Sequence, residues 1–298
     1  MRVTVVHETV YRYESPADYS VQYLRLSPRS TSRQKVISWR LEAPAAPRPW
    51  ADAFGNDAHL LVVARPHAEI KVRARGEVEV EGDEGQGTLE LGPQAAEVYL
   101  RSTPLTQADA ALASFAADFR KEFAADRVKG LERLMTALRD RVEYRPGVTH
   151  AATAAADAFG REAGVCQDHA HIFLACARLL EVPARYVSGY LAAQGTDHLA
   201  SHAWVETWIS GVGWLGYDIA NRTMQGGRHV QLAVGLDYLD ACPVRGFRRG
   251  GAGESMAVEV HVQDAQRARG AQLQGMSQSA QQQALQQAAQ KQAQQQQQ

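Results

Sequence analysis

The sequence predicts an α+β protein, with an N-terminal antiparallel β-sandwich followed by an α+β domain in which a helix packs on an antiparallel sheet. Two observations lead to this class. Residues 1–95 alternate polar and apolar side chains in short runs separated by Pro, Gly, Asn and Asp, which is typical of antiparallel strands. Residues 96–262 begin with helical periodicity and end in further alternating runs. Residues 263–298 have a composition of their own and form a third region.

The alternation in the first region is clearest at its start. The run "RVTVVHETVYRY" places six side chains on one face of a strand: Val3, Val5, His7, Thr9, Tyr11 and Tyr13. "VQYLRLSP", "VISWRLEAP", "AHLLVVARP" and "EIKVRARGEVEVEG" repeat the pattern between turn residues. Several short strands punctuated in this way predict a sandwich or a barrel.

The second region opens with two helices and continues with a third. Apolar residues recur on one helical face in each of the first two segments: Leu112, Phe115, Phe119 and Phe123, then Leu131, Leu134, Met135, Leu138 and Val142. Pro146 ends this part because proline lacks an amide proton. A third helix is expected from 165 to about 181, and a strand follows it. Two alternating runs, 201–210 and 213–221, are joined by "GVG" and predict a hairpin.

Composition and charge restrict the partners. The 298 residues are 45% hydrophobic and carry a formal net charge of −1, which gives no electrostatic reason to expect nucleic acid or an anionic membrane. No apolar run approaches the roughly 18 residues of a spanning helix, and the N-terminus lacks the apolar core of a signal peptide. Three cysteines are an odd, sparse set that suits a reducing compartment, so we expect a cytoplasmic protein. The oligomeric state stays open.

The third region is rich in glutamine. Of the 28 residues in 271–298, 15 are Gln, and Ala supplies much of the rest. Such a segment has almost no apolar side chains to bury, so it cannot offset the entropy lost on ordering. We expect a disordered tail.

A candidate nucleophile lies at the expected start of the third helix. In "AGVCQDHAH", Gly164 and Val165 lead into the helix, so Cys166 falls in its first turn. A helix N-terminus carries about half a positive charge and unpaired amides, which favour a thiolate and can donate to an oxyanion. A nucleophilic thiol also needs a base, and the base needs an acceptor that orients it.

The predicted hairpin offers that base and that acceptor. His202 lies on its first strand and Asp218 on its second, on the same face of the sheet. With the turn at 211–213, position 202 lies across from 220–222, so Asp218 is a diagonal neighbour within a side chain's reach. The other two cysteines have simpler interpretations. Cys176 lies on the apolar face of the third helix and Cys242 in a loop, and both are expected to be packed thiols.

These motifs resemble those of the bacterial transglutaminase-like proteins. "GVCQDHAHIFLACARLLEVPARYVSGYL" is similar to their nucleophile helix and the strand after it, and "SHAWVETWISGVGWLGYDIAN" to their histidine and aspartate hairpin. "YRYESP", "LRLSPR" and "DAFGN" resemble their N-terminal β-rich domain, so the likeness covers about residues 1–262. It implies a papain-like transglutaminase core with Cys166 as nucleophile, His202 as general base and acid, and Asp218 as orienter. The family often has an aromatic residue at the position of His169, and "DPTN" where this chain has "DIAN".

The implied reaction is acyl transfer at an amide through a thioester. Water would complete hydrolysis of a peptide bond or a Gln-type amide, which is the reading we favour, whereas an amine would complete a transglutaminase reaction. Four aromatic side chains are candidates to bind substrate or complete the oxyanion hole: Tyr144, Tyr190, Trp204 and Trp214. The expected partner is a peptide or protein. A non-catalytic binding module with the same fold is the alternative, and the presence of all three triad residues argues against it.

A metal site is the other alternative for this cluster. Cys166 and His169, and His198 and His202, have spacings that resemble zinc ligands. A C-x-x-H pair is a weak pattern in a chain with ten histidines, and neither pair sits in the context of a zinc finger. We therefore expect no metal and no other cofactor.

Overall fold

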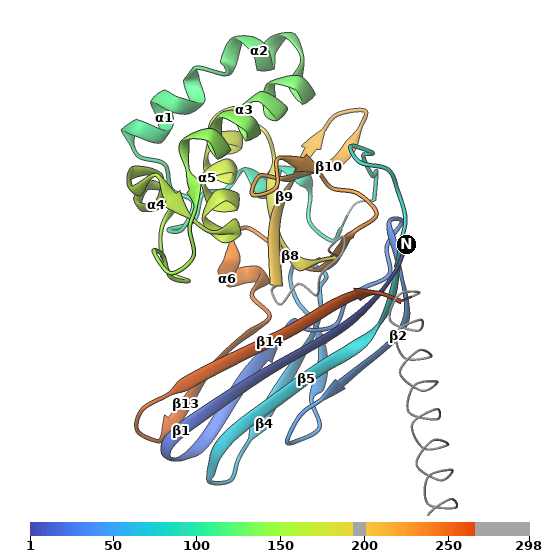
Figure 1. Cartoon of the computed structure of the whole chain (residues 1–298), viewed down its shortest axis with the longest axis vertical. Coiled ribbons are helices and arrows are strands. Elements are labelled where there is room, and N and C mark those ends of the chain that lie inside the picture. Colours follow the sequence, from blue (N-terminus) through green and yellow to red (C-terminus); the bar gives the residue numbers. More distant parts are fainter. Residues whose placement is uncertain (91, 193–200, 266–298) are drawn as a thin grey trace, which may run out of the picture.

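The computed structural model of the protein describes residues 1–90, 92–192 and 201–265. The predicted α+β class is confirmed: a β-rich part lies beside a part in which helices cover an antiparallel sheet (Figure 1). The predicted disordered tail lies outside the described residues, apart from its first three positions. Within the described ranges no helix has the length and apolar character needed to cross a membrane.

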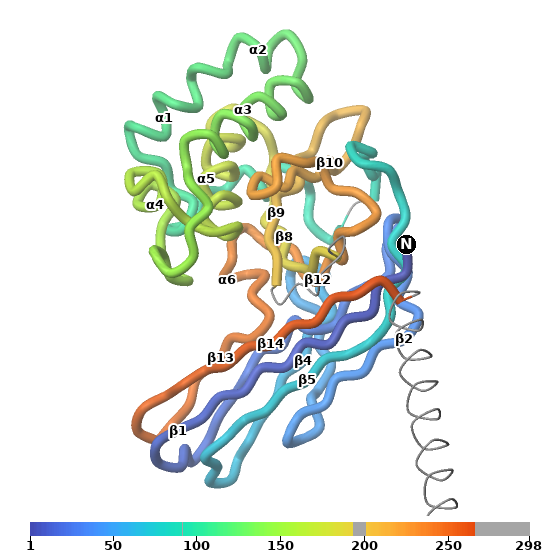
Figure 2. Tube along the Cα trace, in the orientation of Figure 1, coloured from blue at the N-terminus to red at the C-terminus, as the bar shows by residue number. Residues whose placement is uncertain are grey.

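The β-rich part is built around one very long strand. Its seven strands are β1 (Arg2–Leu24), β2 (Gln34–Glu42), β3 (Arg48–Ala51), β4 (Asp57–Val63), β5 (His67–Val80), β13 (Val244–Gly250) and β14 (Ser255–Asp264). The first half of β1 pairs antiparallel with β5 and β14, and its second half pairs antiparallel with β4 and β13. Figure 2 shows three reversals of the chain at one end of the β-rich part: within β1, between β4 and β5, and between β13 and β14.

These reversals make a two-layered structure. Val3 and Val5 from the first half of β1 share one apolar cluster with Leu24 from its second half and Leu61 from the neighbouring β4. All four side chains are fully buried. The alternation of polar and apolar residues along β1 therefore places one face of each half on a common core.

Strands β13 and β14 come from the far end of the described chain. The sequence predicts that residues up to 262 belong to the second region, but the structure pairs both strands with β1. The alternating run "SMAVEVHV" indicates a strand without indicating its partner, because period-two patterning does not encode which edge a strand joins. With β5 and β4 on one side, β1 has a second edge open, and this hairpin fills it.

The second part contains a five-stranded antiparallel sheet in the order β11-β10-β9-β8-β12. These strands are β8 (Ala184–Leu191), β9 (Ser201–Ile209), β10 (Gly213–Asp218), β11 (Thr223–Met224) and β12 (His229–Gly235). The helices are η1 (Ala96–Leu100), α1 (Ala110–Ala117), α2 (Arg120–Ala125), α3 (Arg127–Arg141), α4 (Ala155–Arg161), α5 (Cys166–Leu179) and α6 (Tyr238–Ala241). A short parallel pair, β6 (Glu143–Tyr144) and β7 (Ala163–Gly164), precedes α5.

Helix α5 forms the centre of this part. Phe173 and Cys176 from α5 pack in one cluster with Val205 and Tyr217 from the sheet. Cys176 has no exposed surface, and burial raises the pKa of its thiol to about 12, as expected for a packed cysteine. The opposite side of the sheet faces the β-rich part, whose core includes Tyr190 from β8. The sheet is thus held between helices and sandwich, which fixes its strand ends.

Candidate active site

Cys166 is the first residue of α5, where the sequence predicts it. The helix is capped by Asp168, whose Oδ2 accepts hydrogen bonds from the Val165 amide and the Thr149 hydroxyl, both at 2.7 Å. Gly164 permits this cap, since a Cβ there would lie 2.6 Å from the Cβ of Asp168. Cys166 is partly exposed. Its thiol therefore lies at the positive end of the helix dipole and is open to a substrate.

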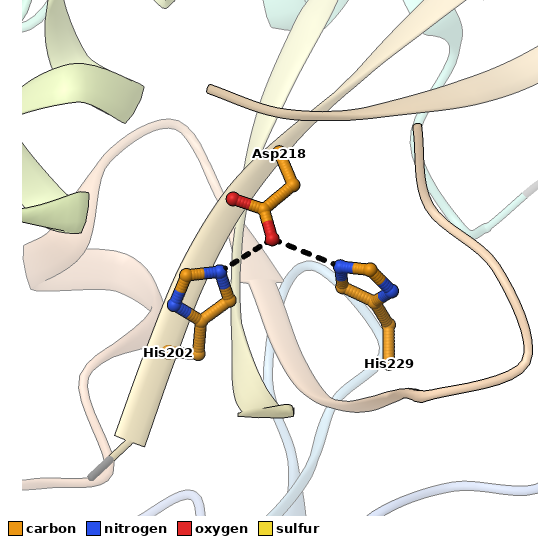
Figure 3. A group of neighbouring side chains, drawn as sticks. All are labelled: His202, Asp218 and His229. Atoms are coloured by element: carbon orange, nitrogen blue, oxygen red, sulfur yellow. Dashed lines mark hydrogen bonds and ion pairs between the residues drawn. The ribbon is translucent and has the colours of Figure 1, made fainter. Parts of the chain in front are cut away.

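His202 and Asp218 come together across the hairpin of β9 and β10. Gly216 pairs with Glu206, which places Asp218 opposite position 204 and diagonal to His202. The His202 Nε2 atom donates to Asp218 Oδ2 at 2.7 Å, as Figure 3 shows. Asp218 is fully buried, and the side chain of His202 is 12% exposed. The bond occupies Nε2, so Nδ1 is the ring nitrogen left for a proton exchange.

The pKa values of this pair move in opposite directions. Burial alone would lower the pKa of His202, but hydrogen bonding to Asp218 and contact with Cys166 outweigh it and raise that pKa to about 10. Burial would raise the pKa of Asp218, but hydrogen bonds from His202 and His229 hold it well below its usual range. The buried carboxylate therefore stays ionised and stabilises a protonated imidazole. That imidazole lies in contact with Cys166.

Two donors to Asp218 were not anticipated from the sequence. His229 Nε2 donates to Asp218 Oδ2 at 3.0 Å (Figure 3), and the Asn221 side-chain amide donates to the same oxygen at 2.8 Å. The Gly226 amide donates to His229 Nδ1 at 3.2 Å, which holds this histidine in the tautomer with its proton on Nε2. Asp218 is thus oriented from three sides. Asn221 ends the "DIAN" motif and could have been singled out there, whereas nothing in the sequence links His229 to the hairpin.

The cluster of His202, Asp218 and His229 also has the composition of a metal site. Its three candidate ligand atoms lie within 4.8 Å of one another. However, both Nε2 atoms lie at hydrogen-bonding distance from one carboxylate oxygen, 2.7 and 3.0 Å, and the Gly226 contact puts a proton on His229 Nε2. A metal ligand needs that nitrogen deprotonated. The donor set fits proton sharing around Asp218 better than it fits a cation.

We predict that His229 orients Asp218. His229→Phe removes one donor to a buried carboxylate and leaves the Gly226 amide without its acceptor. The free energy of unfolding should therefore fall by about 1–3 kcal/mol. Alkylation of Cys166 should slow by about tenfold. His229→Gln restores a donor at the position of Nε2 and should recover most of the loss. Urea unfolding and alkylation rates across pH measure both effects; equal behaviour of the two variants would contradict the prediction.

Trp204, a candidate for substrate binding, packs against the two histidines. Its side chain is fully buried. The ring stacks on that of His202 at 6.2 Å between centroids and meets that of His229 edge-on at 5.2 Å. Gly189 on β8 lies opposite His202. A Cβ at Gly189 would lie 2.6 Å from the Trp204 ring and 2.1 Å from the Val230 carbonyl oxygen.

We predict that Gly189→Ala destabilises the protein by about 1–3 kcal/mol, because the added methyl group displaces Trp204 or the neighbouring strand. Gly160→Ala is the matched control, since a Cβ at Gly160 in α4 would meet nothing within 4 Å. That control should be neutral or stabilising by up to about 1 kcal/mol. Thermal and urea denaturation test the pair. Similar midpoints for both variants would show that Trp204 has room to move.

Of the remaining candidates for substrate binding, Tyr144 lines a cavity beside His202, whereas Tyr190 and Trp214 are buried. A cavity of about 440 Å³ opens beside the histidine, lined by Arg139, Tyr144, Leu191, Ser201, His202, Ala220 and Asn221. Tyr144 is 42% exposed, and burial together with the charges of Cys166 and Asp218 raises its pKa. Tyr190 does not line this cavity: it is buried in the sandwich core with its hydroxyl 2.8 Å from His7 Nδ1. Trp214 is also buried, under the guanidinium of Arg185.

The other polar residues of the opening turns of α5 have structural partners. His169 Nε2 donates to the Val142 carbonyl at 2.9 Å, and His171 Nε2 accepts from the Tyr238 amide at 3.1 Å. Both rings are fully buried. The nitrogen of His169 that points to Val142 is thus engaged with the backbone. The sequence alternative with His198 falls on residues outside the described ranges.

Two family models match this chain. The model of the bacterial transglutaminase-like N-terminal region matches residues 3–79, and the model of the transglutaminase-like superfamily matches residues 114–219. The second match contains Cys166, His202 and Asp218. A crystal structure of a candidate cysteine protease from Cytophaga hutchinsonii has a TM-score of 0.69 and 22% identity, covering 89% of this chain and 91% of its own. At that identity the likeness concerns the fold.

Sequence relatives extend over nearly the whole chain. An uncharacterized protein of Mycobacterium leprae is 33% identical over 277 residues, which cover 88% of this chain and 98% of the relative. An uncharacterized protein of Mycobacterium tuberculosis is 30% identical over 275 residues, which cover 83% and 87%. With both family models matched in order along it, the chain belongs to the bacterial transglutaminase-like family.

Proposed function

We propose that the protein is a cysteine-dependent enzyme that opens an amide bond of a peptide or protein through a thioester on Cys166. The observation that carries this proposal is the His202 side chain, which contacts Cys166 on one side and donates to buried Asp218 on the other. A raised pKa at His202 beside a helix-start thiol is the arrangement that an activated cysteine needs. The family-level assignment to transglutaminase-like proteins supports the same class of chemistry.

The chemical steps follow from these positions. Cys166 Sγ attacks the amide carbonyl, and the tetrahedral oxyanion is stabilised by amides of the first turn of α5, which have no carbonyl partner within the helix. The C–N bond then breaks, and the leaving amine takes the proton from His202 Nδ1. Asp218 keeps the imidazole oriented throughout. In the second half, water or an amine gives its proton to Nδ1 and attacks the thioester, and the Cys166 thiolate leaves.

Hydrolysis is our preferred outcome, with transfer to an amine as the alternative. The cavity beside His202 is lined in part by polar groups, including Ser201 and Asn221, which suit the entry of water to the site. A reducing compartment such as the cytoplasm would keep the catalytic thiol active, and all three cysteines are unpaired. A non-catalytic role for the protein would not require the hydrogen-bonded pair of His202 and Asp218 beside Cys166.

Trapping the acyl-enzyme tests the proposal. A panel of Gln-containing peptides is incubated with the protein, with and without an added primary amine, and intact mass is recorded. An adduct on Cys166 that is lost in Cys166→Ala supports acyl transfer. Release of acid then indicates hydrolysis, and incorporation of the amine indicates transglutaminase activity. If no peptide gives an adduct and Cys166 is alkylated no faster than the buried Cys176, the proposal is wrong.

A further inference from the structure

The cavity beside His202 contains one fixed positive charge. Among its described lining residues, Arg139 alone carries a permanent charge, and the others are neutral apart from His202 itself. Arg139 lies near the end of α3 and is partly buried. A cavity next to a catalytic pair with a single arginine on its wall has the electrostatics of an anion subsite.

The guanidinium of Arg139 is held in place by backbone carbonyls. Its Nε donates to the Ala220 oxygen at 3.1 Å, and its Nη1 donates to the Val142 oxygen at 3.2 Å. Ala220 lies between Asp218 and Asn221 in the segment after β10, so Arg139 is tied to the turn that directly follows the orienting carboxylate. Arginine has five N–H donors, and these two bonds fix the orientation of the rest.

No acidic side chain among the described residues neutralises this charge within ion-pair distance. Other arginines nearby do have carboxylate partners: Arg133 pairs with Glu122, Arg141 with Glu162 and Arg222 with Asp140. The buried carboxylate of the site, Asp218, is already engaged by two histidines. A fixed and unneutralised guanidinium on a cavity wall fits a carboxylate, which it can bind through two parallel hydrogen bonds.

We infer that Arg139 binds a carboxylate of the substrate, so that the enzyme prefers peptides with a negative charge close to the amide that it opens. This inference rests on the proposed function and specifies its substrate class. The carboxylate can belong to an acidic side chain or to a peptide C-terminus. Both sources offer the same planar anion, and both would enter beside Tyr144, which shares the cavity.

Matched alkylating reagents test the inference without a known substrate. Chloroacetylglycine carries a terminal carboxylate, and chloroacetylglycinamide is its neutral equivalent. Chloroacetyl-aspartate amide and chloroacetyl-asparagine amide form a second pair, in which the carboxylate is on a side chain. For each pair, the rate of adduct formation on Cys166 is followed by peptide mass mapping, and the charged-to-neutral ratio of rates is compared between variants.

In Arg139→Gln the ratio should fall about tenfold for at least one pair relative to the wild type. Arg139→Lys, which keeps the charge but not the fork of donors, should give an intermediate ratio. Arg133→Gln on the exposed side of the same helix removes an equal charge and should leave both ratios unchanged. The pair that responds identifies the source of the carboxylate, terminal or side-chain.

A ratio that stays the same in Arg139→Gln for both pairs would overturn the inference, even if both absolute rates fell, because equal losses indicate a purely structural role. The same holds if Arg133→Gln lowers the ratios as much, since that effect would come from general charge. The ratio is defined at any alkylation rate. Slow reaction of Cys166 with the neutral reagent in the wild type would count against the proposed function. The charged-to-neutral ratio would still show whether Arg139 binds a carboxylate, so the two claims fail separately.

Discussion

Replacement of Cys166 by alanine is expected to abolish acyl-enzyme formation and to lower the rate of amide cleavage or transfer by at least about 10⁴-fold. The reason is that the thioester requires the sulfur, and no other described thiol can take its place. Cys176 is fully buried and Cys242 is 2% exposed. Intact-mass detection of the adduct and a product assay with the same peptide measure the loss.

Cys242→Ala is the control for this experiment. Burial raises the pKa of Cys242, so its thiol is both shielded and protonated at neutral pH. The control variant should retain the activity and the adduct of the wild type. Substantial turnover in Cys166→Ala, or loss of turnover in Cys242→Ala with the fold intact, would move the chemistry away from the start of α5.

The hairpin shows what the sequence can predict about this site. Period-two patterning fixes which residues of β9 and β10 share a face, and the short "GVG" turn fixes their register within a residue or two. Together they bring His202 and Asp218 within reach before any coordinates are known. The start of α5 is equally local, because Gly164, Val165 and the capping Asp168 follow each other in the chain.

His229 shows where such reasoning stops. It begins β12, which lies at the opposite edge of the sheet from β11, so the chain crosses the sheet between Met224 and His229. That crossing carries His229 past Asp218, and no local pattern records it. The positions of β13, β14 and Arg139 on α3 are likewise not predictable from local patterns. Each depends on contacts between distant segments, which the hydrophobic periodicity of either segment leaves undetermined.

Replacement of Asp218 by asparagine is expected to slow acyl transfer by about 10³–10⁴-fold while the thiol remains in place. Asparagine keeps the shape but removes the charge that, with Cys166, raises the pKa of His202 to about 10. The pKa of His202 should therefore fall toward its ordinary value of about 6.5. The acyl-transfer activity of the wild type needs the protonated imidazole and should persist until the pH rises through about 10. The residual activity of Asp218→Asn should decline at a lower pH.

The pair of His202 and Asp218 should also make the stability of the wild type depend on pH. A histidine with a folded-state pKa above its unfolded value stabilises the fold fully below about pH 6.5, and this contribution is lost as pH rises through about 10. A carboxyl group with a lowered folded-state pKa, such as Asp218, stabilises above about pH 4 and loses that contribution on acidification. The wild type should therefore gain most from this pair between about pH 4 and 6.5.

The free energy of urea unfolding, measured from pH 4 to 10, tests this dependence. The wild type should lose stability above pH 6.5 with a slope that Asp218→Asn lacks, because the neutral amide no longer favours the imidazolium. Asp140→Asn changes the net charge equally at an exposed residue that pairs with Arg222, so it should keep the wild-type slope. Parallel curves for wild type and Asp218→Asn would mean that Asp218 does not hold His202 protonated.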